Sequence, residues 1–357
     1  MKSSKLATLS VITLLFAACS SEKTTVSSST TESSVSTESS ASTTTPPPVM
    51  GPITVYSGRN EKLIGPLLDR FRTEKGIEVS VRYGDTAEMA GTLLEEGSKT
   101  PADVFISQDA SALGAVTAAN MARPLPPEIT NVVPAAFRSP DGKWVGLSGR
   151  ARSIVYDPAI TSVDKLAVSL DQLAEPRFKG KFGIAPTNAS FQAHMAVYSA
   201  LHGEPALEKL LRGIVANQPK RFANNAAVVQ AVGAGEIMFG LVNHYYVWQA
   251  KKAKPDLSVA NHFLAEGDGS GFVNVAGVAV LSDKPAAMEL VRFLLSDPSQ
   301  QYFAIETYEY PLVATVKPAV DLPPIETLKT PSIDFALVSK ALPRALELIN
   351  STGLNRQ

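Results

Sequence analysis

From residue 53 onward, short runs of β-branched and aromatic residues alternate with segments that repeat apolar residues at helical spacing. Residues 53–56 predict a strand, and residues 61–75 predict a helix that ends at Gly76. The next expected elements are a strand over 78–82, a helix over 86–96 that ends at Gly97, and a strand over 103–106. This β-α-β-α-β order predicts a parallel sheet, with ligand-contacting loops at the carboxyl ends of its strands.

A strand near residues 153–156 begins a second unit of the same kind. The pattern then predicts strands near 181–185 and 237–242, helices near 205–216 and 226–235, an apolar run over 277–281 and a helix over 285–296. We therefore expect an α/β fold of two lobes, each a mixed β-sheet flanked by helices, with a ligand cleft between them.

The chain is expected to cross between the lobes near Arg150 and again near Asn274. These crossings assign residues 51–149 to lobe 1, residues 150–274 to lobe 2, and residues 275–357 to a return to lobe 1 with C-terminal helices. Strands that connect two lobes can act as a hinge, so closure of the lobes could bury a ligand.

The first 19 residues have the features of an export signal. Lys2 and Lys5 precede an apolar run over 6–16, which is too short to span a bilayer as a mature helix. Phe-Ala-Ala-Cys over 16–19 resembles a lipobox, so we expect a lipoprotein signal peptide over 1–18 and lipidation of Cys19. The alternative is an ordinary cleaved signal that contains a cysteine. Residues 19–50 are rich in Ser, Thr and Pro and are expected to form a disordered tether.

The composition excludes several classes of function. The 33 basic and 34 acidic residues give a net charge of −1, which provides no reason to expect a nucleic-acid partner. Cys19 is the only cysteine, so an intramolecular disulfide and a cysteine-rich metal site are excluded. The four histidines form no metal motif, and no nucleophile elbow or phosphate-binding Gly-Lys-Ser/Thr loop is present. We therefore expect no enzyme, because an extracellular hydrolase needs a nucleophile–base pair or a metal-activated water.

The most unusual local feature is Asn-His-Tyr-Tyr over 243–246. If Asn243 caps a helix, Tyr245 and Tyr246 lie in its first turn, where the helix dipole favours negatively charged oxygen. Two neighbouring phenolates are costly at neutral pH, and binding of a highly charged cation would offset that cost. Ferric iron suits such hard oxygen donors. The alternative is that both rings pack at the edge of a lobe.

Polar residues near other helix starts extend this interpretation. Pro-Thr-Asn-Ala-Ser-Phe over 186–191 lies between a predicted strand and a predicted helix, where backbone N–H groups and hydroxyls bind anions. Asn224 and Asn225 begin another helix, and Arg150 lies near the first crossing. Singly, each residue is a helix cap or a surface charge. Together they predict an anion pocket close to the tyrosines, and a small anion there would offset the charge left on iron.

Five blocks of sequence resemble the ferric-ion-binding proteins of bacterial ABC iron importers, within the periplasmic binding protein superfamily. They are Ile-Thr-Val-Tyr-Ser-Gly-Arg over 53–59, Pro-Ala-Asp-Val-Phe over 101–105, Leu-Ser-Gly-Arg-Ala-Arg over 147–152, Asn-His-Tyr-Tyr over 243–246 and Glu-Tyr-Pro-Leu over 309–312. The similarity covers nearly all of residues 52–315. It implies a type II periplasmic-binding-protein-like fold whose lobes close around ferric iron and a synergistic anion, either carbonate or phosphate.

The resemblance also implies roles for individual residues. Tyr245 and Tyr246 match the paired iron ligands. The residues that match anion-binding positions are Asn188, Ser190, Asn225, Asn243 and Arg150.

The first-lobe iron ligands depart from the family pattern. Some members have a histidine at the position of Asn60 and a glutamate at that of Gln108, and neither residue here is an anionic ligand. Other members add a third tyrosine from the loop that corresponds to 188–190, where this chain has none. Glu61 or Asp109, each one residue away, could substitute, or water and the anion could complete the iron's coordination.

The sequence therefore predicts an extracytoplasmic solute-binding lipoprotein, anchored to the cell membrane at the cell surface or in the periplasm. It is expected to be a monomer that delivers ferric iron, free or chelated, to the permease and ATPase of an ABC importer. The nearest alternative is the same fold with another small anionic or amine solute, since Asn60 and Gln108 are uncharged. The two-lobe pattern disfavours a purely structural surface protein.

Overall fold

The computed structural model describes residues 50–264, 269–328, 330, 331 and 333–356. The predicted signal peptide, Cys19 and all but the last residue of the predicted tether lie outside these residues. Among the helices that are described, none is long and apolar enough to cross a membrane.

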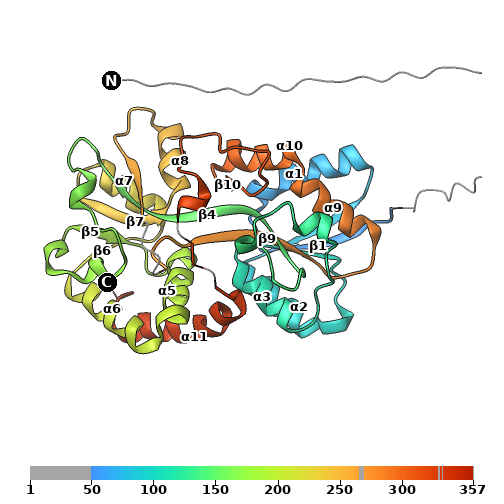
Figure 1. Ribbon diagram of the computed structural model, residues 1–357, viewed down its shortest axis with the longest axis horizontal. Coiled ribbons are helices and arrows are strands. Elements are labelled where there is room, and N and C mark those ends of the chain that lie inside the picture. Colours follow the sequence, from blue (N-terminus) through green and yellow to red (C-terminus); the bar gives the residue numbers. More distant parts are fainter. Residues whose placement is uncertain (1–49, 265–268, 329, 332, 357) are drawn as a thin grey trace, which may run out of the picture. The chain divides into compact units, whose positions relative to one another are not determined.

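Three parallel strands begin the first sheet, in the order β2-β1-β3: β1 (Ile53–Ser57), β2 (Val79–Tyr83) and β3 (Val104–Ser107). Helices α1 (Glu61–Lys75) and α2 (Thr86–Glu96) connect them, which confirms the predicted β-α-β-α-β unit (Figure 1). Gly76 ends α1 with a φ of 63°, a left-handed conformation that glycine adopts without steric cost. The loops after β1 and β3 consequently lie at the same edge of the sheet.

Strand β4 (Val145–Tyr156) belongs to both sheets. Its first half pairs with β9 (Val273–Val280), and its second half pairs with β7 (Phe239–Asn243) and β8 (Ala260–Phe263). The strand is longer than the predicted 153–156 because glycine and arginine residues over 146–152 interrupt the apolar pattern. Arg150 and Asn274, at which the chain is predicted to cross between lobes, face each other in the β4–β9 ladder.

The second sheet is also mixed. Strand β5 (Phe182–Ile184) runs parallel to β6 (Lys220–Arg221) and to β7, whereas β4 runs antiparallel to β7 and β8. The helices of this region are α5 (Ala189–His202), α6 (Glu204–Ala216), α7 (Asn225–Gly233) and α8 (Tyr245–Ala253). The predicted strands and helices of this part are therefore confirmed to within a few residues.

The C-terminal part contributes elements to both halves. It contains α9 (Pro285–Leu295), α10 (Asp297–Tyr302), the π-helix η6 (Phe303–Thr307), strand β10 (Tyr310–Pro311), which pairs with β4, and α11 (Phe335–Ser351). Helix α11 contacts α5 and α6 as well as α3 (Ala110–Ala118), so it packs against both halves (Figure 1).

Short helices lie in the remaining connections of the described chain. They are η1 (Gly97–Lys99), α4 (Pro127–Thr130), η2 (Ala135–Phe137), η3 (Val163–Lys165), η4 (Asp171–Ala174), η5 (Pro176–Phe178) and η7 (Ile325–Leu328).

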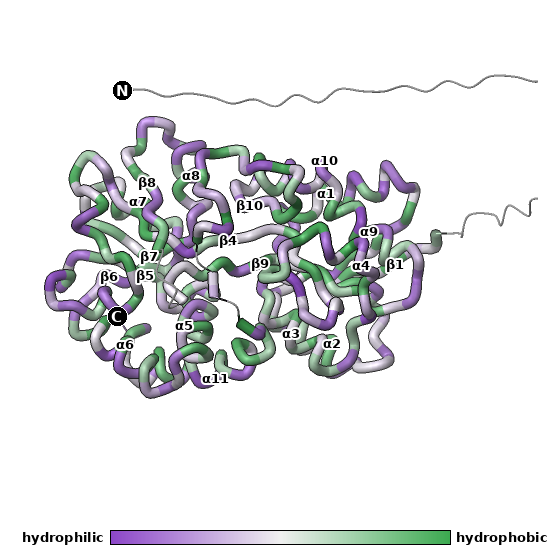
Figure 2. Tube along the Cα trace, in the orientation of Figure 1, coloured by the Kyte–Doolittle hydropathy of each residue, from purple (hydrophilic) through white to green (hydrophobic). Residues whose placement is uncertain are grey.

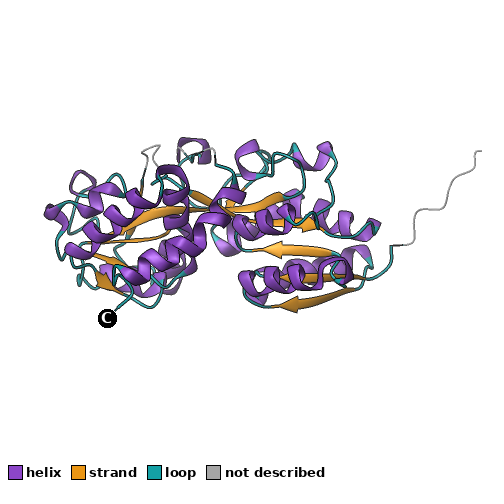
Figure 3. Cartoon of the chain, turned by 90° about the horizontal axis from the view of Figure 1, so that it is seen from below, coloured by secondary structure: helices purple, strands orange, loops and turns teal. Residues whose placement is uncertain are grey.

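Helices cover the strands, and the core lies between these layers (Figure 3). Hydropathy along the trace follows this arrangement, since hydrophobic residues mark β9, all eight of whose residues are buried (Figure 2). The buried carboxyl ends of β3 and β7 and the buried middle of β4 bring polar side chains from distant parts of the sequence together.

Candidate functional site

The two adjacent tyrosines begin helix α8. Tyr245 and Tyr246 are its first two residues, which confirms their predicted place in the first turn of a helix. The expected cap is wrong by one residue, because Asn243 is the last residue of β7 and His244 occupies the cap position. Both tyrosines are half-buried, and their rings stack with centroids 4.5 Å apart and planes inclined by 29°. The two hydroxyls therefore belong to neighbouring side chains at one helix start.

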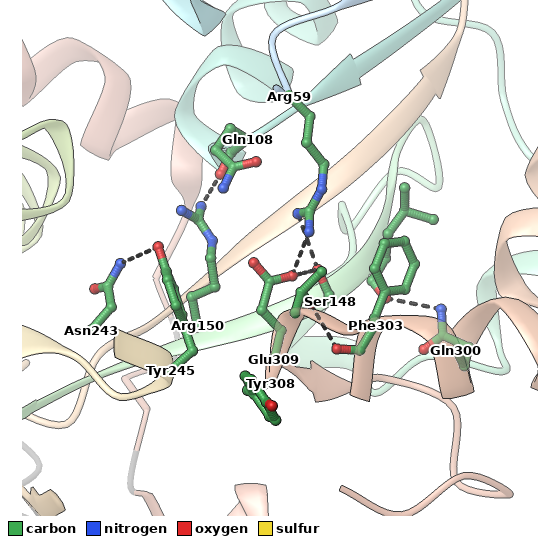
Figure 4. A network of polar contacts seen from close by, with 12 residues as sticks. Arg59, Gln108, Ser148, Arg150, Asn243, Tyr245, Gln300, Phe303, Tyr308 and Glu309 are labelled. Atoms are coloured by element: carbon green, nitrogen blue, oxygen red, sulfur yellow. Dashed lines mark hydrogen bonds and ion pairs between the residues drawn. The ribbon is translucent and has the colours of Figure 1, made fainter. Parts of the chain in front are cut away.

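Electrostatics keep the Tyr245 hydroxyl protonated in the absence of a cation. Burial and the neighbouring Tyr246 raise the pKa of Tyr245 above its ordinary value, while the Arg150 guanidinium opposes that rise. Figure 4 shows Arg150 beside Tyr245, and the Asn243 amide donates to the Tyr245 hydroxyl at 3.5 Å. A phenolate at this position consequently requires additional positive charge nearby.

Arg152 connects the predicted anion-binding residues, a role that the sequence pattern did not indicate. This side chain is only 1% exposed, and its Nη1 donates to Ser190 Oγ at 3.1 Å and to Asn243 Oδ1 at 3.0 Å. Its Nε and Nη2 atoms are buried and have no hydrogen-bond partner among the residues that the structure describes. Burial lowers the pKa of Arg152 to about 9, although Tyr245 and Tyr246 act in the opposite direction. A buried guanidinium with two unpartnered donors is suited to an anion with two oxygens.

Two further predicted anion-binding residues, Asn188 and Asn225, join this network. Asn188 caps α5, and its Oδ1 accepts from the Ser190 N–H at 3.1 Å, the Ser190 hydroxyl at 2.6 Å and the Asn225 amide at 3.1 Å. The Asn225 amide also donates to Ser190 Oγ at 3.1 Å. Asn225 is the first residue of α7, which Asn224 caps. The starts of α5 and α7 are therefore held together at the Arg152 side chain.

Arg150 points elsewhere. Its guanidinium donates to the main-chain carbonyl of Gln108, in the loop after β3, rather than to the Arg152 network (Figure 4). Within the described part of the chain, Arg150 Nε and Gln108 Oε1 are both buried without a hydrogen-bond partner. Arg150 thus lies between the loop after β3 and the Tyr245 side chain, while Arg152 connects the starts of α5 and α7.

The remaining first-lobe candidates have local roles in the structure. Asn60 caps α1 by accepting from the Lys62 N–H at 2.9 Å, and Glu61 is the exposed first residue of that helix. Asp109 caps α3 by accepting from the Ser111 N–H at 2.7 Å, and its other oxygen accepts from Asn274. Among the hydrogen bonds of the described chain, none joins Asn60, Glu61 or Asp109 to the tyrosine pair.

Histidine and carboxylate side chains build no metal site of their own here. Within residues 50–356, where described, no three His, Cys, Asp or Glu side chains lie together in a way that could hold a metal ion. His244 is fully buried, its Nδ1 accepts from the Ala151 N–H at 3.1 Å and its Nε2 donates to the Tyr308 carbonyl at 2.9 Å. Burial lowers the pKa of His244 to about 4, so it is neutral at physiological pH.

A second neutral histidine makes stability depend on pH. Burial and the nearby Arg152 charge lower the pKa of His194 to about 3. When pH falls below about 6.5, the unfolded chain binds the proton and the folded chain does not, so the free energy of unfolding decreases down to about pH 3. We expect urea denaturation of wild type and His194→Phe to show pH slopes that differ by about 1.4 kcal/mol per pH unit in this range. Parallel curves would contradict the neutral assignment.

A buried ion pair lies on the other side of Arg150. Arg59, in the loop after β1, donates to Glu309 Oε2 at 2.7 Å, and Ser148 of β4 donates to the same oxygen at 2.5 Å (Figure 4). Burial alone would raise the pKa of Glu309, but the Arg59 and Arg150 charges and the Ser148 hydroxyl hold it below its ordinary value. Three of the five sequence blocks therefore meet at one carboxylate, although up to 250 positions separate their residues.

Comparison with protein families shows which class of protein has this architecture. Residues 99–338 match the family described as bacterial extracellular solute-binding protein. The major ferric iron-binding protein of Neisseria meningitidis serogroup B is 34% identical over 316 residues, which cover 85% of this chain and 94% of that protein. The Fe(3+)-binding periplasmic protein of Serratia marcescens is 29% identical and covers 85% of this chain and 90% of its own length.

Solved structures agree with this match. Iron-bound HitA from Pseudomonas aeruginosa superimposes with a TM-score of 0.76 at 29% identity, covering 85% of this chain and 99% of that one. Trichodesmium IdiA (FutA), in complex with iron and citrate, gives a TM-score of 0.70 at 28% identity, with coverage of 85% and 99%. The predicted two-lobe α/β fold is confirmed by these likenesses.

Proposed function

Because this chain belongs to the family of bacterial extracellular solute-binding proteins, we propose that it captures ferric iron outside the cytoplasm and delivers it to an ABC importer. Relatives that are named as ferric iron-binding proteins align with most of the chain, which supports iron as the solute. The protein performs no reaction itself. The importer's ATPase supplies the energy, and docking on the permease favours the conformation that releases the iron.

The observation that carries this proposal is the position of Tyr245 and Tyr246 at the start of α8, beside a buried arginine pair. The two phenols stack, and burial raises the pKa of Tyr245, so its ionisation costs free energy that bound Fe³⁺ would offset directly. Hard phenolate oxygens match the hard ferric ion. With two phenolates bound, the ion keeps one positive charge, and that charge attracts an anion.

The Arg152 network is our candidate for the synergistic anion site. Asn188, Ser190, Asn225 and Asn243 orient the guanidinium and its surroundings, and the unpartnered Nε and Nη2 donors are available to an oxyanion. Carbonate and phosphate both offer two adjacent oxygens for such a bidentate contact. Arg150, which reaches Gln108 instead, would act on the anion only after a change of partner.

For the remaining coordination positions, Glu61 is the best protein candidate. Its carboxylate is exposed, whereas that of Asp109 already caps α3 and accepts from Asn274. Asn60 and Gln108 offer neutral oxygens only, so water and the anion complete the sphere if Glu61 does not reach the iron. Lipidation of Cys19 would keep this monomeric receptor on the membrane that carries its permease.

Metal analysis and a visible spectrum of freshly purified protein test the proposal. We expect about one iron per chain and an orange-red colour from phenolate-to-iron charge transfer, with tighter iron binding when bicarbonate or phosphate is added. Calorimetry with ferric citrate and with a panel of iron-free organic anions and amines separates the alternative solute. Tight binding of an iron-free solute, with no affinity for iron, would replace the proposal by that alternative.

A further inference from the structure

The buried Arg59–Glu309 ion pair and the neighbouring Tyr308, which we call the corner, connect the loop after β1 to helix α8. Arg59 and Glu309 are 0% and 2% exposed, and their ion pair of 2.7 Å lies where β1, β4 and the segment after η6 meet. The Arg59 guanidinium also lies 5.1 Å from the centre of the Phe303 ring, in η6. Isolated buried charges are expensive, so this pair holds Glu309 firmly in one position.

Tyr308, the residue before Glu309, has an unusual backbone. It ends the π-helix η6 with a φ of 57°, in the left-handed region that few residues other than glycine adopt. This turn directs the Tyr308 carbonyl to His244 Nε2, which donates to it at 2.9 Å. A strained corner of this kind persists only where its surroundings fix it, and the adjacent Arg59–Glu309 pair provides that restraint.

His244 connects the fixed Tyr308 carbonyl to Tyr245 and Tyr246. Its Nδ1 accepts from Ala151 at the crossing point of β4, so the imidazole is held from two sides. The same residue occupies the N-cap position of α8 and immediately precedes Tyr245, whose ring contacts the imidazole edge to face, with the ring centroids 5.8 Å apart and the planes inclined by 83°. The direction in which α8 begins, and with it the direction of both phenols, therefore depends on the imidazole.

We propose that Glu309 is a positioning residue for iron capture, which acts through the Tyr308 carbonyl and His244 to fix the geometry of Tyr245 and Tyr246. This inference rests on the proposed function, because the tyrosines must bind iron for their geometry to matter. Arg59 directly precedes Asn60 and Glu61, so one corner fixes both the first-lobe loop and the second-lobe tyrosines. This series of contacts, from Glu309 through the Tyr308 carbonyl to His244, is the relay. Together with Arg59 it fixes the positions of two segments from different lobes that carry candidate ligands for the same ion.

Matched substitutions at His244 separate the two hydrogen bonds of the imidazole. In His244→Asn the shorter amide can replace only Nδ1 and keeps the Ala151 contact, whereas in His244→Gln the longer amide reaches the position of Nε2 and Tyr308. We expect His244→Asn to lose iron to a competing chelator about 10- to 100-fold faster and to shift the charge-transfer band. His244→Gln should recover most of both properties.

Glu309→Gln tests the remote end of the relay. It should change the band and the iron dissociation rate in the same direction as His244→Asn, and the double variant should be no worse than His244→Asn alone, because both changes release the same corner. Asn217→Ala is the control. It removes two hydrogen bonds of the buried Asn217 amide, to the Leu173 and Glu175 carbonyls, and should lower stability without moving the band.

The outcomes are distinguishable. If wild type binds no iron and shows no band, the proposed function fails. If wild type is coloured but His244→Asn and Glu309→Gln lower only the thermal midpoint, as Asn217→Ala does, the corner has a structural role and the inference is overturned. Additive effects of the two substitutions on iron dissociation would overturn it as well.

Discussion

Replacing both Tyr245 and Tyr246 by phenylalanine is expected to remove the orange-red colour of the iron-loaded protein and to weaken iron binding by at least about 1,000-fold, or about 4 kcal/mol. The reason is that the ion loses two anionic oxygens that no other described side chain near α8 replaces. Stability should change little, since the rings keep their stacking and, among the described residues, the only hydrogen bond lost is the 3.5 Å contact with Asn243.

Titration with ferric citrate, followed by the visible band and by bound metal, measures this effect. Tyr156→Phe is a suitable control, because Tyr156 is another half-buried tyrosine, at the end of β4. It should bind iron as wild type does. A double variant that keeps both the colour and the affinity would refute the assignment of the tyrosines.

Replacing Arg152 by methionine should move iron affinity and stability in opposite directions. Arg152→Met removes the two unpartnered donors, so we expect iron affinity to fall about 10- to 100-fold and no longer to respond to bicarbonate or phosphate. Stability should stay constant or rise, because an apolar side chain of similar length replaces a buried charge that has no ionic partner among the described residues.

Arg221→Met serves as the matched control for this substitution. Arg221 donates from Nε to the Leu354 carbonyl at 2.7 Å, and no hydrogen bond of the described residues joins it to the Arg152 network. Its replacement should leave the anion dependence of iron binding intact. An Arg152→Met protein whose iron affinity still increases with added bicarbonate would show that the anion binds elsewhere.

The elements of the fold were predictable where local pattern and tertiary environment agree. The first five elements follow from apolar periodicity and from Gly76 and Gly97, which end their helices. Strand β4 was underestimated because Arg150 and Arg152 make its buried middle look like a loop. Burial of those arginines depends on partners that are 38 to 91 positions away, which no local window contains.

The candidate site was predictable only in part, for the same reason. The tyrosine dipeptide is visible in the sequence, and its place at a helix start follows from the strand before it. Arg152 was missed although Arg-x-Arg within a strand places both side chains on one face, a spacing that could have indicated a cationic site. The Arg59–Glu309 pair joins residues 250 positions apart and required the structure.

The most direct test of the account is a crystal structure of the iron-loaded protein, with the metal located by anomalous diffraction at the iron edge. We predict an iron peak within bonding distance of both the Tyr245 and Tyr246 oxygens, and an oxyanion between that ion and the Arg152 guanidinium. A peak at any other position, with the two phenols turned away from it into the protein interior, would contradict the central claim.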